Sequence, residues 1–193
     1  AYVNISEFRE MDGIEQATRF GEYEARARLT SGSVNSTFIC IDRHEFGDIA
    51  FWRQDFASTR LGYLLNNLAT SRDSVLVSHD FMAERDLDVG DFLDIDVLSG
   101  GETFSMTVRI VGSIDHFPRW YPDNDGSLFV GNLDYLFERA QIELTHLVLA
   151  RINESFDEDA VRNRLLPLGI SNIIVEEPFT RIEREQARPE RQG

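Results

Sequence analysis

The sequence predicts an α+β fold, in which short helices and strands follow one another along 193 residues. Residues 92–99 alternate between apolar and polar side chains, which is the period of a half-buried strand. Gly100 and Gly101 then form a two-residue link to the next strand, so this region predicts an antiparallel hairpin. Four leucines recur at the spacing of one helical face: Leu61, Leu64, Leu65 and Leu68.

The first part of the chain predicts one helix end and two strands. Residues 5–11 form the end of a helix that Asp12-Gly13 closes. Residues 14–29 are extended, and the turn at 31–33 leads back into a strand at 37–42.

The middle of the chain contains the elements with the strongest local signals. Residues 45–56 place Phe46, Ile49, Ala50 and Phe56 on roughly one helical face, and the leucine-rich helix follows. After it we expect a strand at 75–78, a helical turn at 79–86, a turn at 89–91, the strand at 92–99 and a long strand at 103–117.

The last part predicts two further helices and three strands. Residues 127–130 and 145–152 are strands on either side of a helix at 133–139. Ser155 and Glu158 have the spacing of a capping box, which opens a helix with Val161 and Leu165 facing inward. Pro167 and Gly169 end this helix, and a last strand covers 170–175. Residues 180–193 are charged all round and predict a solvated polar stalk or a frayed end.

These elements divide the chain into lobes. Residues 1–44 and 140–179 have the strand and helix content of a split βαβ lobe, while 45–139 predict a small α/β lobe with a mostly antiparallel sheet. The chain is long enough to bury a sizeable core, as one domain or as two small lobes.

The charge of the chain restricts its partners and its chemistry. A formal net charge of −15 argues against nucleic acid and anionic lipid surfaces, since both attract cationic proteins. All 19 cationic residues are Arg, so the chain has no Lys for a phosphate-binding P-loop or a Schiff base. Cys40 is the single cysteine, excludes an internal disulfide and is expected to be a buried small hydrophobe.

The chain has no run of 18 apolar residues and no signal peptide at its N-terminus. This is the pattern of a soluble protein, and equally that of a domain excised from between two membrane helices. The abrupt start at Ala1 and the stop at Gly193 fit excision.

Four clusters of polar residues contain residue types that occur in reactive or metal sites. Ser78-His79-Asp80 contains the residue types of a hydrolase triad, but consecutive side chains diverge and a helix N-terminus capped by Ser78 is favoured. Asp123 to Gly126 resembles the start of a calcium loop, yet Leu128 replaces the required Gly, which favours a surface turn. The remaining two clusters are scattered acids and histidines without metal-ligand spacing: Asp91, Asp94 and Asp96, and Asp115 and His116 with His44 and His146. We therefore expect no catalytic residue, cofactor or metal.

The loop after the long strand is the candidate contact surface. Phe117 directly precedes Pro118, and Trp120 and Tyr121 stand between Pro118 and Pro122. Such aromatic residues form either a packed lid over the core or a contact with a partner, because Trp and Tyr dominate interface hot spots. Both interpretations remain open from the sequence.

Residues 75–118 combine an apolar strand, a short helix, Leu-x-Val-Gly-Asp, a hairpin and a final Val-Gly-x-x-x-x-Phe-Pro. This order resembles the extracytoplasmic domain of FtsX-like permeases of ABC transporters, the MacB-type periplasmic core domain. Residues 12–18 (DGIEQAT) are similar to the family's Pro-Gly-Val-x-x-Ala-Thr, with Asp12 in place of Pro. Further similar segments are Ile41-Asp42 with Phe46 and residues 52–56, residues 132–137 (NLDYLF), and the tail at 186–193.

The resemblance implies a non-catalytic domain that couples the motion of membrane helices to an external substrate or envelope partner. It implies a discontinuous porter-like lobe (1–44 plus 140–179), an inserted lobe (45–139) and a stalk (180–193) that leads towards a membrane helix. The expected partners are a membrane-embedded parent permease and a cytoplasmic ABC ATPase subunit, with the domain on the extracytoplasmic side of the cell membrane. Two alternatives are a free-standing ligand- or peptide-binding domain and a metal-assisted hydrolase.

Overall fold

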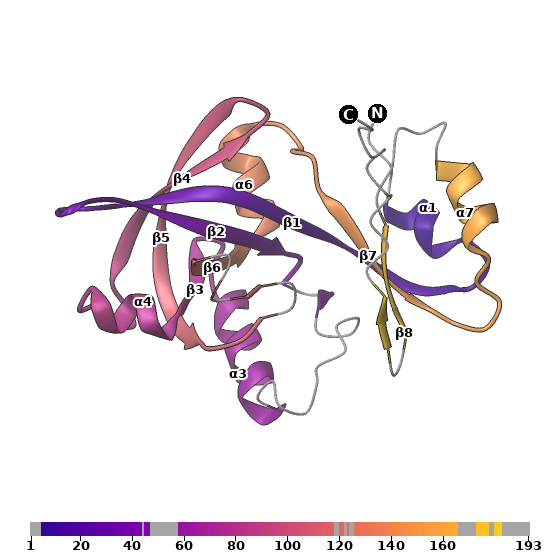
Figure 1. Cartoon of the computed structure of the whole chain (residues 1–193), viewed down its shortest axis with the longest axis horizontal. Coiled ribbons are helices and arrows are strands. Elements are labelled where there is room, and N and C mark those ends of the chain that lie inside the picture. Colours follow the sequence, from indigo (N-terminus) through magenta and orange to yellow (C-terminus); the bar gives the residue numbers. More distant parts are fainter. Residues whose placement is uncertain are drawn as a thin grey trace, which may run out of the picture. The chain divides into compact units, whose positions relative to one another are not determined.

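A computed structural model describes residues 5–43, 45–46, 58–117, 120–121, 123, 126–165, 173–177 and 180–182. The chain consists of two compact units. Unit 1 comprises Ala1–Arg19, Asp48–Phe51 and Leu147–Gly193, and unit 2 comprises Phe20–Gly47 and Trp52–His146. Helices and strands occur in both units, which confirms the predicted α+β class (Figure 1).

Unit 2 is built on a closed ring of six strands. They are β1 (Ile14–Leu29, from Phe20 onward), β2 (Gly32–Ile41), β3 (Ser74–Ser78), β4 (Phe92–Ser99), β5 (Glu102–Ile114) and β6 (Ser127–Asn132). Each strand pairs with the next in the order β1-β2-β6-β3-β5-β4, and β4 pairs with β1 to close the ring. The β2–β6 and β3–β5 pairs are parallel, whereas the other four are antiparallel.

The interior of this barrel is filled by large and small side chains that face one another. Ala25 lies opposite Val97 on one side and Ser36 on the other. Gly131 leaves room for Phe38, because a Cβ at Gly131 would lie 2.7 Å from the Cζ of that ring. A small barrel tapers, and alternation of small and large residues lets its interior close without voids.

Within the described part of unit 2, helices α3 (Ser58–Ala69), α4 (His79–Glu84) and α6 (Leu133–Ala140) accompany the ring of strands. Leu64 and Leu68 of α3 are buried, as the leucine spacing predicts. Helix α3 packs closely on β5, since a Cβ at Gly112 would lie 2.7 Å from Leu64 Cδ2. Helices α4 and α6 both add apolar side chains to the barrel core.

The predicted hairpin of β4 and β5 is confirmed. Its two-residue link has positive φ at both positions, 60° at Gly100 and 81° at Gly101, which glycine adopts without steric cost. Strand β5 ends at Ile114 rather than at Phe117. The last three predicted residues belong to the following loop.

Unit 1 contains α1 (Ile5–Arg9), the first residues of β1, β7 (Leu147–Ile152), α7 (Glu158–Leu165), β8 (Ile173–Glu177) and β9 (Thr180–Ile182). Strands β1, β7, β8 and β9 are neighbours in that order, and β7 and β8 are parallel. A separate core holds the unit together: Phe8, Met11, Ile14, Ala17, Val148, Ala150, Ile152 and Val161. Strands β7 and β8 with α7 form a strand–helix–strand unit, while the complete split βαβ lobe remains a prediction.

Helix α7 begins at a different cap from the predicted one. Asp157 Oδ1 accepts hydrogen bonds from the main-chain N–H groups of Asp159 and Ala160, at 3.0 and 3.2 Å. Asp157 is therefore the N-cap, and the capping box assigned to Ser155 and Glu158 is wrong. A carboxylate two residues later competes successfully because it accepts hydrogen bonds more strongly than a hydroxyl.

The units also divide the chain differently from the sequence analysis. Residues 20–44, expected in the first lobe, lie in unit 2, where β1 and β2 supply two of the six barrel strands. The inserted sheet is therefore a closed mixed barrel rather than a small sheet confined to 45–139. Strand β9 occupies the first three residues of the expected stalk. Residues 183–193, most of the helix expected at 45–56, and Pro167 and Gly169 lie outside the described residues.

Candidate functional site

The loop after β5 contains the three aromatic residues predicted to form a partner contact. Phe117 is 2% exposed and Trp120 is 8% exposed, whereas Tyr121 is 54% exposed. Trp120 Nε1 donates a hydrogen bond to Gly126 O over 3.0 Å, so the indole closes the loop on itself. Two of the three side chains thus pack inward, and Tyr121 is the one that offers surface to a partner.

The loop residue Phe117 forms a stack of three phenylalanine rings with Phe46 and Phe20. The ring of Phe46 is 5.6 Å from that of Phe117 and 6.1 Å from that of Phe20, with interplanar angles of 12° and 28°. All three side chains are fully buried. The loop is therefore anchored by aromatic packing as well as by its own hydrogen bond, which accords with the packed-lid interpretation for Phe117 and Trp120.

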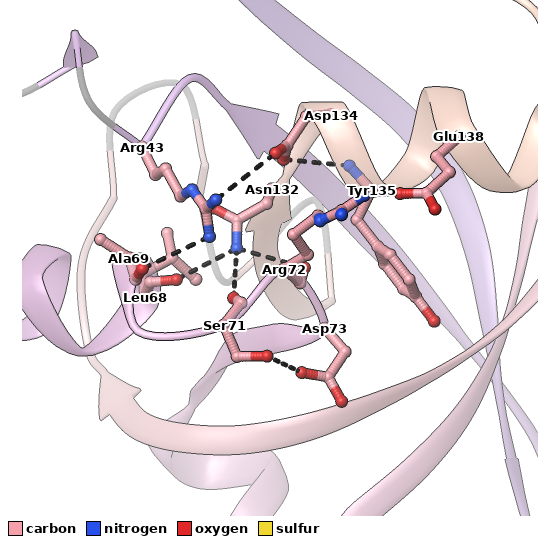
Figure 2. Close-up of polar contacts among 10 residues, drawn as sticks. All are labelled: Arg43, Leu68, Ala69, Ser71, Arg72, Asp73, Asn132, Asp134, Tyr135 and Glu138. Carbon is pink, nitrogen blue, oxygen red and sulfur yellow. Dashed lines mark hydrogen bonds and ion pairs between the residues drawn. The ribbon is translucent and has the colours of Figure 1, made fainter.

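A buried polar cluster lies where β6 passes into α6 (Figure 2). Asn132 is 2% exposed, and its Nδ2 donates to the main-chain oxygens of Leu68, Ser71 and Arg72 at 3.0, 3.0 and 3.2 Å. These oxygens belong to the end of α3 and the turn that leads into β3. One side chain therefore serves both Leu68 O, which the end of the helix leaves without an intrahelical partner, and two oxygens of the turn that follows.

Charged residues extend this cluster on both sides (Figure 2). Arg43 Nη1 donates to Ala69 O at 3.3 Å, and Arg43 Nη2 lies 3.7 Å from Asp134 Oδ2. A cation at the C-terminal end of α3 also complements the helix dipole. Arg72 pairs with Glu138 of α6. We call these four charged residues and Asn132 the Asn132 tie, because they join α3, the end of β2 and α6.

The Asn132 tie gives a physical role to a segment that the sequence analysis recognised only by resemblance. Within residues 132–137, Asn132 and Asp134 hold the tie, and Leu133 and Leu136 are buried in the barrel core. Tyr135 Oη donates to Thr107 O of β5 at 3.1 Å. Sequence reasoning missed the role of Asn132, since its three acceptors lie 60 to 64 residues away along the chain.

The structure separates the residues of the triad-like segment. Ser78 occupies the N-cap position of α4, but its side chain makes no capping hydrogen bond. Its Oγ instead accepts from Leu128 N at 3.1 Å and joins β3 to β6. His79 and Asp80 are exposed. The predicted position of Ser78 is right, whereas its predicted capping bond is wrong, because the adjacent strand supplies a buried donor.

Among the acids and histidines with possible ligand roles, Asp94 and Asp96 lie on β4 and His146 directly precedes β7, while His44 lies outside the described residues. Asp94 and Asp96 of β4 accept hydrogen bonds from Thr107 and Ser105 of β5, at 2.7 and 2.6 Å, as part of the solvent face of the hairpin. His146 Nδ1 donates to Leu144 O at 2.9 Å. Across the described part of the chain, no three His, Cys, Asp or Glu side chains are grouped so that they could hold a metal ion.

One pair of polar groups is buried inside the barrel core. Cys40 is fully buried, as predicted, and burial raises the pKa of its thiol, with the Asp134 carboxylate adding to the rise. Burial also raises the pKa of the Tyr23 phenol, with smaller contributions from Cys40 and Glu143. Both groups are therefore protonated at neutral pH, and the thiol is a poor nucleophile.

Among the described residues, every helix is too short or too polar to span a bilayer.

Comparison with known proteins gives structural neighbours but no family. No family model matches the chain, and no curated protein matches it. Among solved structures, the chain is similar to the extracellular domain of the noncanonical ABC-type transporter YknZ from Gram-positive bacteria, with a TM-score of 0.48 and 17% identity over 86% of this chain and 81% of that one.

Two further structures are similar over comparable lengths. One is a domain of a protein described as a permease from Porphyromonas gingivalis, with a TM-score of 0.48 and 13% identity over 86% of this chain and 74% of that chain. The other is the periplasmic region of MacB from Actinobacillus actinomycetemcomitans, with a TM-score of 0.44 and 8% identity over 85% of this chain and 70% of that chain.

Proposed function

We propose that this chain is a non-catalytic extracytoplasmic domain of an ABC transporter permease. In this role it couples the motion of membrane helices to a substrate or protein partner outside the membrane. Its parent would be embedded in the membrane, and a separate cytoplasmic subunit would hydrolyse ATP. The lack of Lys in this chain supports that division, since a P-loop requires one.

The observation that carries the proposal is the spread of permease-like motifs over nearly the whole chain. Residues 12–18 contribute to unit 1, and residues 132–137 contribute to unit 2. Gly13 and Asn132 hold main-chain segments together in their units, through a close backbone approach at Gly13 and three hydrogen bonds at Asn132. Residues that shape a framework are what a family of mechanical parts has in common, whereas an enzyme family shares reactive groups.

Each unit has its own apolar core. A unit with its own core can move as a rigid body, and rigid-body motion is one of the ordinary ways in which proteins transmit a conformational change. A contact from the loop after β5 would be made through Tyr121, since Phe117 and Trp120 are buried.

The location of the domain can be tested by labelling the full-length gene product in intact cells. Cys40 is fully buried and gives a low background, whereas Tyr63 on α3 is 66% exposed. A Tyr63→Cys variant should react with a membrane-impermeant maleimide on intact cells, as read from the peptide that contains position 63, and the same peptide without this change should not be modified. Labelling of the variant only after lysis would place the domain inside the cell and contradict the proposal.

The second part of the test concerns the complex. The full-length protein, purified in detergent, should carry an ATP-hydrolysing subunit with it. Purification as a single polypeptide, released outside the cell without such a subunit, would favour a free-standing binding domain. Stoichiometric zinc in the purified protein, lost together with its stability on chelation, would favour the metal-assisted alternative.

A further inference from the structure

The turn between α4 and β4 exposes two large apolar side chains within four residues. Val89 and Phe92 are both 63% exposed. The next residue, Leu93, is 4% exposed and faces the barrel core, so Phe92 lies on the solvent side of β4. We call residues 84–94 the α4–β4 tip.

The main chain of the α4–β4 tip is held by hydrogen bonds to β5. Gly90 N donates to Ile110 O at 2.8 Å, and Ile110 N donates to Asp91 O at 2.9 Å. Within the turn, Asp88 N donates to Asp91 Oδ2 at 2.8 Å. The turn is therefore ordered before any contact. Binding of a partner to Val89 and Phe92 would cost little conformational entropy of the turn.

Carboxylates surround the two apolar side chains. Five acidic residues of the α4–β4 tip are exposed: Glu84, Asp86, Asp88, Asp91 and Asp94. The cationic groups nearby are fewer: Arg85 lies over the ring of Phe81 at 6.0 Å, and Arg109 is half-buried opposite Phe92. The surface around Val89 and Phe92 is thus negative.

This combination restricts what can bind. An anionic lipid headgroup or a nucleic acid would be repelled by the carboxylates. A second copy of a chain with net charge −15 would be repelled as well. A protein surface with an apolar depression bordered by Lys or Arg complements both features, because apolar side chains supply hot-spot area and the charges steer encounter and register.

We propose that the α4–β4 tip is a docking site for a basic protein partner, with Val89 and Phe92 inserted into an apolar depression bordered by Lys or Arg. The inference deepens the proposed function and rests on it, since it locates the envelope partner on unit 2.

Site-specific photo-cross-linking in the full-length protein tests this assignment. Benzoylphenylalanine at position 92 should give a protein adduct in intact cells. The same probe at position 63 is the matched control, because Tyr63 is a similarly exposed aromatic residue on α3. The adducted partner peptide, read by mass spectrometry, should contain Lys or Arg beside apolar residues, and the yield should fall several-fold when the ionic strength is raised.

A charge variant separates a docked partner from accidental capture. Asp86→Asn with Asp94→Asn removes two carboxylates but keeps local structure: Asn tolerates the positive φ of 53° at position 86, and its oxygen can still accept the hydrogen bond from Thr107. This double variant should reduce the adduct at position 92 several-fold and leave urea unfolding unchanged. No adduct, an adduct to lipid or to a second copy, or an adduct insensitive to the double variant would each overturn the assignment.

The two proposals fail in different ways. If the α4–β4 tip is not a docking site, position 92 gives no charge-dependent adduct while the maleimide labelling of Tyr63→Cys and the associated ATP-hydrolysing subunit remain. If the proposed function is wrong, the labelling or the associated subunit is lost whatever happens at position 92.

Discussion

Replacement of Gly13 by Ala should destabilise unit 1 far more than backbone conformation alone predicts. Gly13 has φ of 85°, and a Cβ there would lie 2.3 Å from both Cα and N of Phe156. Ordinary contact begins at 3.4 Å, so the backbone at Phe156 would have to move by about 1 Å. This movement would also strain the hydrogen bond from Asn153 N to Gly13 O, now 2.9 Å.

Gly101 provides a matched control for the conformational part of this cost. Its φ is 81°, and a Cβ there would meet no atom within 4 Å. Gly101→Ala should therefore cost about 1–2 kcal/mol, the cost of a left-handed conformation for an L-residue. Gly13→Ala adds about 1–3 kcal/mol of overpacking and about 1 kcal/mol for the hydrogen bond, about 3–6 kcal/mol together.

Hydrogen–deuterium exchange read by mass spectrometry can measure the two effects separately. Gly13→Ala should remove protection from peptides that cover β7 in unit 1, and Gly101→Ala should lower protection modestly in peptides that cover β4 and β5. The deuterium uptake of each peptic peptide is compared with that of the same peptide from the unmodified chain under the same conditions. Equal losses of stability in the two variants would refute the argument, since the steric clash with Phe156 would then carry no cost.

Four further comparisons test other parts of the structure. Asn132→Ala should lower the free energy of unfolding in urea by about 2–4 kcal/mol, and Asn132→Asp by at least as much, because a carboxylate would face three carbonyl oxygens. A loss under about 1 kcal/mol for both variants would show that the Asn132 tie has no role in stability. Trp120→Ala should cost about 3–5 kcal/mol and Tyr121→Ala under about 0.5 kcal/mol, as judged by denaturation midpoints; a small effect at Trp120 would instead revive it as a contact residue. Asp157→Ala should cost about 1 kcal/mol and Ser155→Ala much less, and the reverse order would restore the capping box. Cys40 should resist thiol reagents until the chain unfolds. Because the folded state raises the pKa of its thiol, the unfolded chain loses this proton first, and the free energy of unfolding should fall above about pH 9 by up to about 1.4 kcal/mol per pH unit. Cys40→Ala should reduce this slope.

The elements of the chain were predictable because their causes are local. The alternation in β4, the two glycines of the hairpin link and the leucine spacing of α3 each act within a few residues, and the structure confirms all three. Cys40 was expected to be buried from the apolar run around it, and it is. Caps were less predictable, because a cap depends on which nearby acceptor reaches the free N–H groups, and Asp157 does so where Ser155 was expected.

Closure of the barrel was decided by tertiary structure alone. Strand β2 pairs with β6 about 90 residues later in the chain, and β1 pairs with β4 about 70 residues later. Strand periodicity records which face of a strand is buried, but it does not record which strand lies alongside. For this reason the sequence alone predicts β1 and β2 as part of the first lobe.

Burial of the candidate contact loop was decided in the same way. The sequence determined that Phe117, Trp120 and Tyr121 lie close together around Pro118 and Pro122, and it left a packed lid and a partner contact open. The partners of these side chains come from distant segments, Phe46 for Phe117, or depend on how the loop folds back, Gly126 for Trp120. Aromatic residues serve cores and interfaces by the same apolar area, so only the packing around them distinguishes the two roles.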